Sequence, residues 1–437
     1  MPVYLVMLAA VIAAGIPLCS KKAGKAGRII FCIAAALMFT FVSAVRFKVG
    51  YDYNLYGGLY FNMKYLEWVD IPSLDQEKGF LIPFYILNLA NEEYYHAFIF
   101  TSILFYPVIF YFIYRYSKHP WLSTTAFLCF GIFFNSLCFL RQFLAAMIIL
   151  YAMKFIEGKN PLRFFVLTII ASAFHWSALI WLVLYFLVKI KPGWIYLGII
   201  AAGTTIFCFI SRKLMYWLVD NFEMYSLYNP DTNLEASQGL SPWFSVMFAV
   251  IFVIAFLFRK RLADKNPANM IYLNCLMYTV VFEVMGTRHA ILSRFALLVY
   301  LTPVLYMIPD IFDSVREYID EKISGRDKLK PVRTITAVFA AMFSAACYIL
   351  LIQNNYNGVN PYVSQFHKTE ELFVEYTDKP AVTTTAVIDS PVTTTAGESG
   401  DTTSSATTKQ EPVETNDPAD NPAELEEDIL NALEQLG

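Results

Sequence analysis

Long apolar segments separated by short polar turns constrain this chain more than any other feature of its sequence. A helix needs about 20 mostly apolar residues to cross a bilayer, and backbone groups inside lipid must be satisfied within the protein. The 437-residue chain is 57% hydrophobic and 16% charged, and it offers about twelve segments of suitable length and composition. They lie at residues 3–19, 28–45, 94–114, 121–138, 142–157, 162–174, 176–188, 194–210, 242–258, 269–286, 294–308 and 334–352. We therefore predict an all-α polytopic membrane domain at residues 1–352.

The positions of Lys and Arg predict which loops face the cytoplasm. Short cytoplasmic loops collect these residues, and most of the 33 occur in alternate loops of this chain. The basic loops lie at residues 21–28, 115–118, 154–163, 189–191, 259–265 and 309–333. Both termini and the loops at residues 46–93 and 211–241 are then expected outside a bacterial cytoplasmic membrane.

One apolar stretch, GFLIPFYILNLA at residues 79–90, does not fit this alternation. It is short for a span, and counting it as one would invert every later loop. We predict a re-entrant or interfacial segment, which requires that its backbone be buried in protein.

The C-terminal region has a different composition from the membrane domain. Residues 353–437 are acidic and rich in Thr, Ser and Pro, which is typical of a disordered chain. Only residues 422–436 show helical spacing, with Leu425, Ile429, Leu430 and Leu433 on one side. This short helix is interpreted either as a frayed end of an extracellular spacer or as a docking peptide for a partner.

Several common chemistries have no signature in this sequence. The seven cysteines show no CxxC pair, so neither a disulfide framework nor a zinc site is expected. There is also no phosphate-binding loop and no dinucleotide-binding fingerprint. We predict no metal, no cofactor and no nucleic-acid partner.

Polar residues at the predicted outer side are the candidates for function. Arg141 and Gln142 stand between two apolar helices, His175 joins two others, and Arg288 and Arg294 flank a later turn. An arginine at such depth usually faces a bundle interior or a wet cavity and marks a functional path. The alternative is an interfacial anchor that reaches the lipid headgroups.

The stretch VGYDYNLYGGLYFN, residues 49–62, adds a carboxylate and several aromatic rings on the same side. Taken alone, Asp52 with Tyr53 and Tyr56 forms an ordinary aromatic belt with a turn. Together with Glu77 and the outer arginines, it offers sugar-binding rings and carboxylates beside cations that suit a diphosphate.

Five short motifs occur in order along the chain, all at the predicted outer side. They are RFKVGYDYNLY (residues 46–56), EKGF (77–80), LRQFLA (140–145), FHWSAL (174–179) and SRFALLVY (293–300). In these motifs the sequence resembles the EpsG family, which belongs with the Wzy-type polysaccharide polymerases. The likeness covers roughly residues 1–365 and leaves out the tail.

The resemblance implies a glycosyltransferase-type enzyme that joins oligosaccharide repeat units carried on undecaprenyl diphosphate. A hydroxyl of an incoming unit would attack the anomeric carbon of the growing chain and expel its lipid diphosphate. The product would be an exopolysaccharide of a capsule or biofilm, made at the outer face of the membrane. The expected partners are the lipid-diphosphate-linked oligosaccharide and other assembly proteins, such as a flippase and a chain-length regulator.

Preorganised cations stabilise a departing diphosphate, and we assign this role to Arg141 and Arg294, with Arg46 and Arg288 as further candidates. A base could deprotonate the attacking hydroxyl. His175 is the first choice, because its unperturbed pKa lies near neutral pH, and Asp52 is the second. The residues expected to position the sugars are Glu77, Tyr53 and Tyr56, and Gln142 is a further candidate for substrate binding.

Other functions stay open at this point. A flippase or other transporter would also need polar groups in a helical bundle, but they should line a path at mid-membrane. A membrane-bound O-acyltransferase could use His175 as its base, and it would need a pocket that reaches the cytoplasmic side. A scaffold role through the tail is the third alternative.

Overall fold

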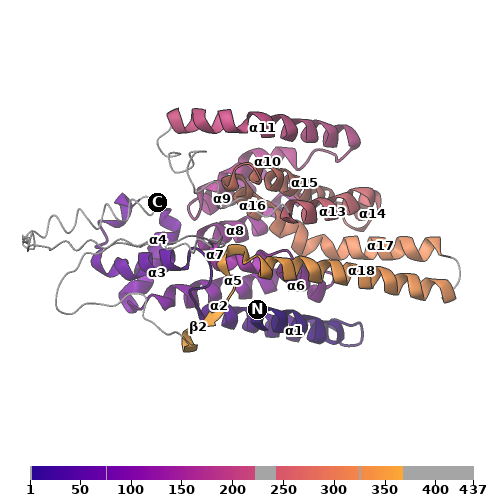
Figure 1. Ribbon diagram of the computed structural model, residues 1–437, viewed down its shortest axis with the longest axis horizontal. Coiled ribbons are helices and arrows are strands. Elements are labelled where there is room, and N and C mark those ends of the chain that lie inside the picture. Colours follow the sequence, from indigo (N-terminus) through magenta and orange to yellow (C-terminus); the bar gives the residue numbers. More distant parts are fainter. Residues whose placement is uncertain (1, 75, 222–242, 324–325, 368–437) are drawn as a thin grey trace, which may run out of the picture.

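The computed structural model describes residues 2–74, 76–221, 243–323 and 326–367. Most of these residues are helical, and the long helices run along the long axis of the molecule (Figure 1). The α-helices are α1 (Pro2–Leu18), α2 (Gly24–Ala44), α3 (Tyr53–Asn62), α4 (Lys78–Ala90), α5 (Tyr95–Tyr116), α6 (Pro120–Cys129), α7 (Ile132–Cys138), α8 (Leu140–Glu157), α9 (Pro161–Ser172), α10 (Trp181–Leu187), α11 (Trp194–Asn221), α13 (Trp243–Leu257), α14 (Arg259–Lys265), α15 (Asn269–Gly286), α16 (Ala290–Tyr306), α17 (Ile308–Lys322) and α18 (Arg326–Gln353). The shorter elements are the 3₁₀ helices η1 (Met63–Tyr65), η2 (Ile71–Ser73), η3 (Trp176–Ile180), η5 (Tyr356–Gly358) and η6 (Gln365–His367), and the strands β1 (Arg46–Phe47) and β2 (Val363–Ser364).

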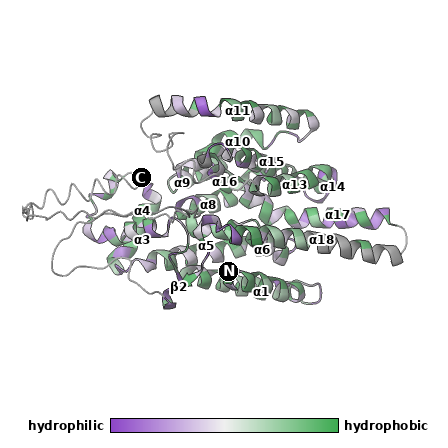
Figure 2. Ribbon diagram, in the orientation of Figure 1, coloured by the Kyte–Doolittle hydropathy of each residue, from purple (hydrophilic) through white to green (hydrophobic). Residues whose placement is uncertain are grey.

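Each predicted spanning segment coincides with helical structure, but not each is long enough to cross a membrane by itself. In the described part of the chain, three helices pass on length and composition, namely α2, α5 and the Trp194–Leu214 part of α11. Two bent helix pairs raise this number to five. The apolar helices indicate a multi-pass membrane protein (Figure 2). The number of twelve spans stays a prediction.

The structure shows a break within one predicted span and corrects the boundaries of two predicted loops. The segment at 121–138 is a pair of helices, α6 and α7, which meet at an angle of 58°. The predicted loop at 309–333 is helical over most of its length, because α17 follows α16 after a bend of 47° and α18 begins at Arg326. Residues 211–221, expected in a loop, continue α11, while 222–242 lie outside the described residues.

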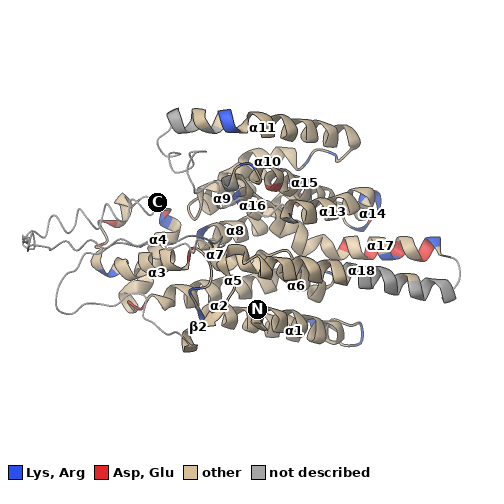
Figure 3. Ribbon diagram, viewed as in Figure 1, with Lys and Arg blue, Asp and Glu red and all other residues tan. Residues whose placement is uncertain are grey.

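Four of the six predicted basic loops meet at one end of the molecule, which we call the α14–α17 end. Charged residues gather on α14 and α17 at this end (Figure 3). Contacts between the loops join Arg28 to Ser117, Lys118 to Asp310, His119 to Asp313 and Lys265 to Glu317. The amphipathic sequence of α17 supplies the acidic partners of the last three of these contacts, and the first is made to the backbone carbonyl of Ser117. The loops therefore lie on one side, as the alternation of basic residues predicts.

The opposite end, here the α3–α4 end, carries the predicted outer loop at residues 46–93 (Figure 1). Helix α4 begins beside Ala173, whose carbonyl accepts a hydrogen bond from Gly79 at 2.8 Å. It ends beside α3, since Tyr60 donates to the Asn91 carbonyl at 2.6 Å. Both ends of α4 therefore lie at the same end of the molecule, and residues 79–90 do not cross it.

The segment after α18 is folded, in contrast to the prediction that the disordered tail begins at residue 353. Strand β2 pairs antiparallel with β1, with Arg46 opposite Ser364 and Phe47 opposite Val363. Val359 is fully buried in this segment. The membrane domain thus extends to at least residue 367, and residues 368–437, with the predicted helix at 422–436, lie outside the described residues.

Candidate active site

Four of the five motifs are joined by side chains at the α3–α4 end, and Glu77 lies at the centre of this arrangement. Its Oε2 accepts a hydrogen bond from Arg141 Nη1 at 2.8 Å. Its Oε1 lies 2.8 Å from His175 Nδ1 and accepts a bond of 3.2 Å from the Trp176 backbone N–H. One carboxylate therefore joins residues that are 64 and 98 positions away in the chain.

The contact with Glu77 sets the tautomer of His175. An ionised carboxylate has only acceptor sites, so Nδ1 carries the proton in this hydrogen bond. The neutral ring then keeps a lone pair on Nε2, which is the arrangement of a general base oriented by a carboxylate. The side chain of His175 is 23% exposed, so the ring lies at the edge of the site rather than in the core.

Glu77 is ionised at neutral pH in this setting. Burial of the side chain would by itself raise the pKa of Glu77. The hydrogen bond with His175 and the charge of Arg141 outweigh that effect and lower the pKa to about 2. Both carboxylate oxygens are engaged, so the geometry favours a role in holding Arg141 and His175 over the predicted contact with sugars.

Gly79 explains how Glu77 reaches His175. In the first turn of α4, the Gly79 N–H bonds to the Ala173 carbonyl, just before the FHWSAL motif. A Cβ atom at position 79 would lie 2.5 Å from that oxygen and 2.8 Å from the carbonyl carbon. Real Cβ atoms do not approach backbone so closely, so a glycine is required for α4 to dock here. The EKGF motif thus combines the charged group with the residue that allows its approach.

Arg141 lies in the first turn of α8 and reaches two neighbours. Besides Glu77, its guanidinium lies near the hydroxyl of Tyr56 and interacts with it electrostatically. It also lines a pocket of about 250 Å³ together with Leu55, Tyr56, Leu59 and Gln76. The pocket is small and open to solvent, so a lipid-linked oligosaccharide would extend well beyond it.

Asp52 precedes α3 and faces two arginines of other motifs. Burial raises the pKa of Asp52, although the charges of Arg294 and Arg141 and a hydrogen bond with Cys138 act in the opposite direction. Asp52 makes no side-chain cap to α3. The site therefore contains two carboxylates with opposite pKa shifts, a pattern that is typical of acid–base sites.

Gln142 connects the fifth motif, SRFALLVY, to the cluster around Glu77. Its amide nitrogen donates to the backbone carbonyl of Arg294 and lies 3.4 Å from Ser177 Oγ. The guanidinium of Arg294 lies 5.5 Å from the ring centre of Phe139. Gln142 thus fixes α16 and η3 relative to α8, and it is buried.

Three predicted site residues do not join the cluster. Arg46 is fully buried, donates to Ser43 and to the Leu137 carbonyl, and lies 4.7 Å from the ring centre of Phe98. Tyr53 is also buried, and its hydroxyl donates to the Arg46 carbonyl. Arg288 is exposed beyond the end of α15. Arg46 and Tyr53 support the loop that carries Asp52. A role of Arg288 in substrate binding stays a prediction.

Other residues of the site have no assigned role in the sequence analysis. Ser177 contacts Gln142, Cys138 contacts Asp52, and Gln76 lines the pocket beside Arg141. Ser177 stands inside the FHWSAL motif, and Gln76 is adjacent to Glu77, so proximity to the motifs is the signal that could have identified them. Nothing in the sequence marks Cys138.

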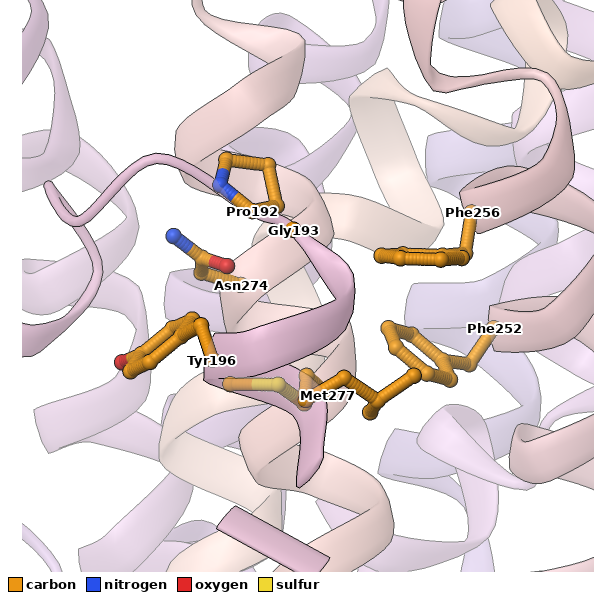
Figure 4. A pocket seen from close by; sticks show the side chains of 8 residues that line it. Pro192, Gly193, Tyr196, Phe252, Phe256, Asn274 and Met277 are labelled. Atoms are coloured by element: carbon orange, nitrogen blue, oxygen red, sulfur yellow. The ribbon is translucent and has the colours of Figure 1, made fainter. Parts of the chain in front are cut away.

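A second pocket lies between α11, α13 and α15 (Figure 4). It is a shallow depression lined by apolar groups such as Phe252, Phe256 and Met277, with Asn274 as a polar neighbour. No charged side chain and no motif residue lines it, so it offers nothing for a diphosphate. Among the described residues there is also no group of three or more His, Cys, Asp or Glu side chains that could hold a metal.

The comparisons with known proteins give one result. The model of the EpsG family matches residues 29–364, which include all five motifs and most of the folded segment after α18. No curated protein and no solved structure matches the chain.

Proposed function

The chain belongs to the EpsG family, and we propose that it is a polymerase for lipid-diphosphate-linked oligosaccharides. It joins these repeat units into an exopolysaccharide at the outer face of the cytoplasmic membrane. The α3–α4 end faces outward in this proposal, because the basic loops gather at the opposite end and cytoplasmic loops collect Lys and Arg.

The reaction transfers the growing chain from its lipid diphosphate to an incoming repeat unit. A hydroxyl oxygen of that unit forms a bond to the anomeric carbon, and the bond from this carbon to the diphosphate oxygen breaks. The hydroxyl proton passes to a base, and the lipid diphosphate leaves with the bonding electron pair. No nucleotide is consumed, because the donor already carries the leaving group.

Arg141 and Arg294 bind the diphosphate in this mechanism. A guanidinium has five N–H donors in a planar fork, so Arg141 keeps donors for phosphate oxygens while Glu77 fixes its position. Fixed cations in a partly dehydrated site stabilise the charge that develops on the leaving group. Arg294 adds a second charge beside Asp52.

His175 is the proposed base. Its Nδ1 is bound to Glu77, and its Nε2 is left to accept the proton of the attacking hydroxyl. The ionised Glu77 then stabilises the imidazolium, in the manner of an acid–histidine pair. Asp52 is the second candidate for this role, and Gln142 positions the surrounding helices.

The observation that carries the proposal is that Glu77 binds Arg141 and His175 at once, beside Asp52 and Arg294. The test incubates purified protein with a lipid-diphosphate oligosaccharide from its own pathway and separates the products by size. Wild type is expected to give a ladder of longer chains without nucleotide. Arg141→Ala is expected to lower the rate by about 10²- to 10³-fold, the usual effect of removing one preorganised donor.

Two further variants sharpen this test. Arg141→Lys keeps the charge but not the planar fork, so full activity in this variant would contradict the proposed role of the guanidinium. Arg261→Ala removes an arginine that pairs with Glu321 at the α14–α17 end, and it should polymerise like wild type. If wild type gives no ladder and instead moves the intact substrate across liposome bilayers, the protein is a transporter.

A further inference from the structure

The folded segment after α18 packs directly on the loop that carries Asp52. We propose that residues 355–365, here called the clasp, position this loop for the reaction. The inference rests on the proposed polymerase function and adds a positioning role for residues that lie outside the five motifs.

Backbone hydrogen bonds join the clasp to the loop at two adjacent residues. Gly50 donates to the Gly358 carbonyl, and Tyr51 donates to the Asn357 carbonyl, each at 3.0 Å. Asp52 is the next residue along the chain. The backbone on which Asp52 stands is therefore held by the clasp and not only by α3.

A second set of contacts holds the other end of the clasp. Gln365 donates from its backbone to the Val45 carbonyl at 2.7 Å and from its side chain to the Tyr53 hydroxyl at 2.7 Å. The β1–β2 pair lies between these contacts. The clasp thus spans the loop from its beginning after α2 to the start of α3.

Asn135 of α7 anchors the clasp in the core. Its side-chain oxygen accepts hydrogen bonds from Asn357 at 2.6 Å and from the Tyr356 hydroxyl at 2.9 Å. Tyr356 also stacks on Phe244, with 4.6 Å between the ring centres. Because α7 also carries Cys138, the clasp and the contact partner of Asp52 share one support.

The sequence NNYNG at residues 354–358 suits this conformation. Asn355, Asn357 and Gly358 have φ values of 48°, 60° and 66°, a region that Asn and Gly adopt more readily than other residues. A Cβ atom at position 358 would lie 2.8 Å from the Tyr51 ring. Gly358 is therefore the position at which a small change would displace the loop without altering a charged group.

The test measures polymerisation by Gly358→Ala in the full-length protein. A misplacement of about 1 Å can cost 10²-fold in rate, so kcat should fall by up to this factor while KM for the lipid-linked donor stays unchanged. The matched control is Gly24→Ala. Gly24 also has a left-handed φ, of 61°, but its Cβ would meet nothing within 4 Å.

The pH profile separates positioning from a general loss of structure. Asp52 faces Arg294 of α16, Arg141 of α8, Tyr56 of α3 and Cys138 of α7. Burial is the main cause of its raised pKa, so loosening the loop should lower this pKa and move to lower pH the part of the acid limb that reports ionisation of Asp52. Asn357→Gly, which keeps the backbone freedom and removes the bond to Asn135, should change the profile in the same direction. If Gly358→Ala does not fold, the Asn357→Gly variant tests the positioning role.

Each outcome bears on one hypothesis. A lowered kcat with a shifted acid limb supports the clasp. The Gly24→Ala control is expected to keep the kcat and pH profile of wild type. If folded Gly358→Ala or Asn357→Gly behaves like this control, or loses activity equally at every pH, the positioning role is wrong. A wild-type protein that makes no polymer contradicts the proposed function itself and is recognised before any variant is compared.

Discussion

The two ends of the molecule use charged residues in different ways. At the α14–α17 end, Arg261 and Glu321 form an ion pair whose side chains are 31% and 58% exposed. At the α3–α4 end, Arg141 and Glu77 form a pair whose side chains are 20% and 6% exposed. Exposed pairs cost little to form and contribute little to stability, whereas buried charges are expensive to desolvate.

This difference in burial indicates which of the two ends carries functional residues. The exposed pairs at the α14–α17 end follow from the loops that collect Lys and Arg, and they need no other explanation. The buried pair at the α3–α4 end is not an economical way to stabilise a fold, because apolar residues of similar volume often serve equally well. The free energy of desolvating the Arg141–Glu77 pair is understandable if the site needs these charges for a reaction.

The comparison predicts its largest effect for the two histidines that contact carboxylates. His175 contacts Glu77, and His119 contacts Asp313 at the opposite end. A general base is typically worth about 10²- to 10⁴-fold, so His175→Gln should lower kcat by that factor in the polymerisation assay. His119→Gln should behave like wild type. If His175→Gln and His119→Gln lowered kcat by the same factor, the proposed functional difference between the two ends would be wrong.

Acid stability should depend on the buried pair. The folded pKa of Glu77, about 2, lies below its ordinary value of 4.5, so ionised Glu77 stabilises the protein above about pH 4.5. This stabilisation is lost as the pH falls from about 4.5 toward 2, and the shift corresponds to roughly 3 kcal/mol at most. The thermal midpoint in detergent should therefore fall over this range in wild type. It should change less in Glu77→Gln, and parallel curves for the two proteins would contradict the effect.

The close approach of α4 to α9 predicts a smaller effect. Gly79→Ala places a methyl group against the Ala173 backbone, and overpacking of this kind costs about 1–3 kcal/mol. We expect a lower thermal midpoint together with reduced activity, because the displaced turn carries Glu77. The control is Gly203→Ala in α11, where a Cβ would meet nothing within 4 Å. A Gly79→Ala protein that matches the control would show that α4 tolerates movement.

The smallest effect is expected at the α14–α17 end. Glu321→Gln removes the charge that pairs with Arg261, and the exposed side chains remain solvated. Neither the thermal midpoint nor the polymerisation rate should change measurably. A clear loss of activity would mean that this end also takes part in the reaction.

Part of the fold could be predicted from local sequence patterns. Apolar runs identify the helices, because spanning a membrane requires a contiguous segment of sufficient length. The alternation of basic loops also predicts that these loops lie on one side. The contacts that Arg28, Lys118 and Lys265 make with neighbouring loops agree with this prediction. The break between α6 and α7 could not be predicted in this way, since the apolar sequence continues through it. At α17 the sequence turns polar, which predicts the end of the span but not the helix that follows it.

The residues of the site could be predicted as a set but not in their roles. Glu77 was expected to position sugars, and only the structure shows that both of its oxygens are engaged by Arg141 and by His175 with Trp176. Arg46 was expected to bind substrate, and the structure buries it among Ser43, Leu137 and Phe98. An arginine therefore supports the fold at position 46, whereas the arginine at position 141 faces the site.

The sequence alone determined the membrane class, the helical segments and the set of polar groups, because these follow from composition and from spacing between near neighbours. Only the tertiary structure decided which groups meet. Contacts such as Glu77 with His175, 98 residues apart, and Asn357 with Asn135, 222 residues apart, depend on how helices pack. The same dependence explains why residues 353–367 look like the start of a tail in sequence and yet fold as part of the domain. Their buried hydrogen-bond partners lie far away in the chain.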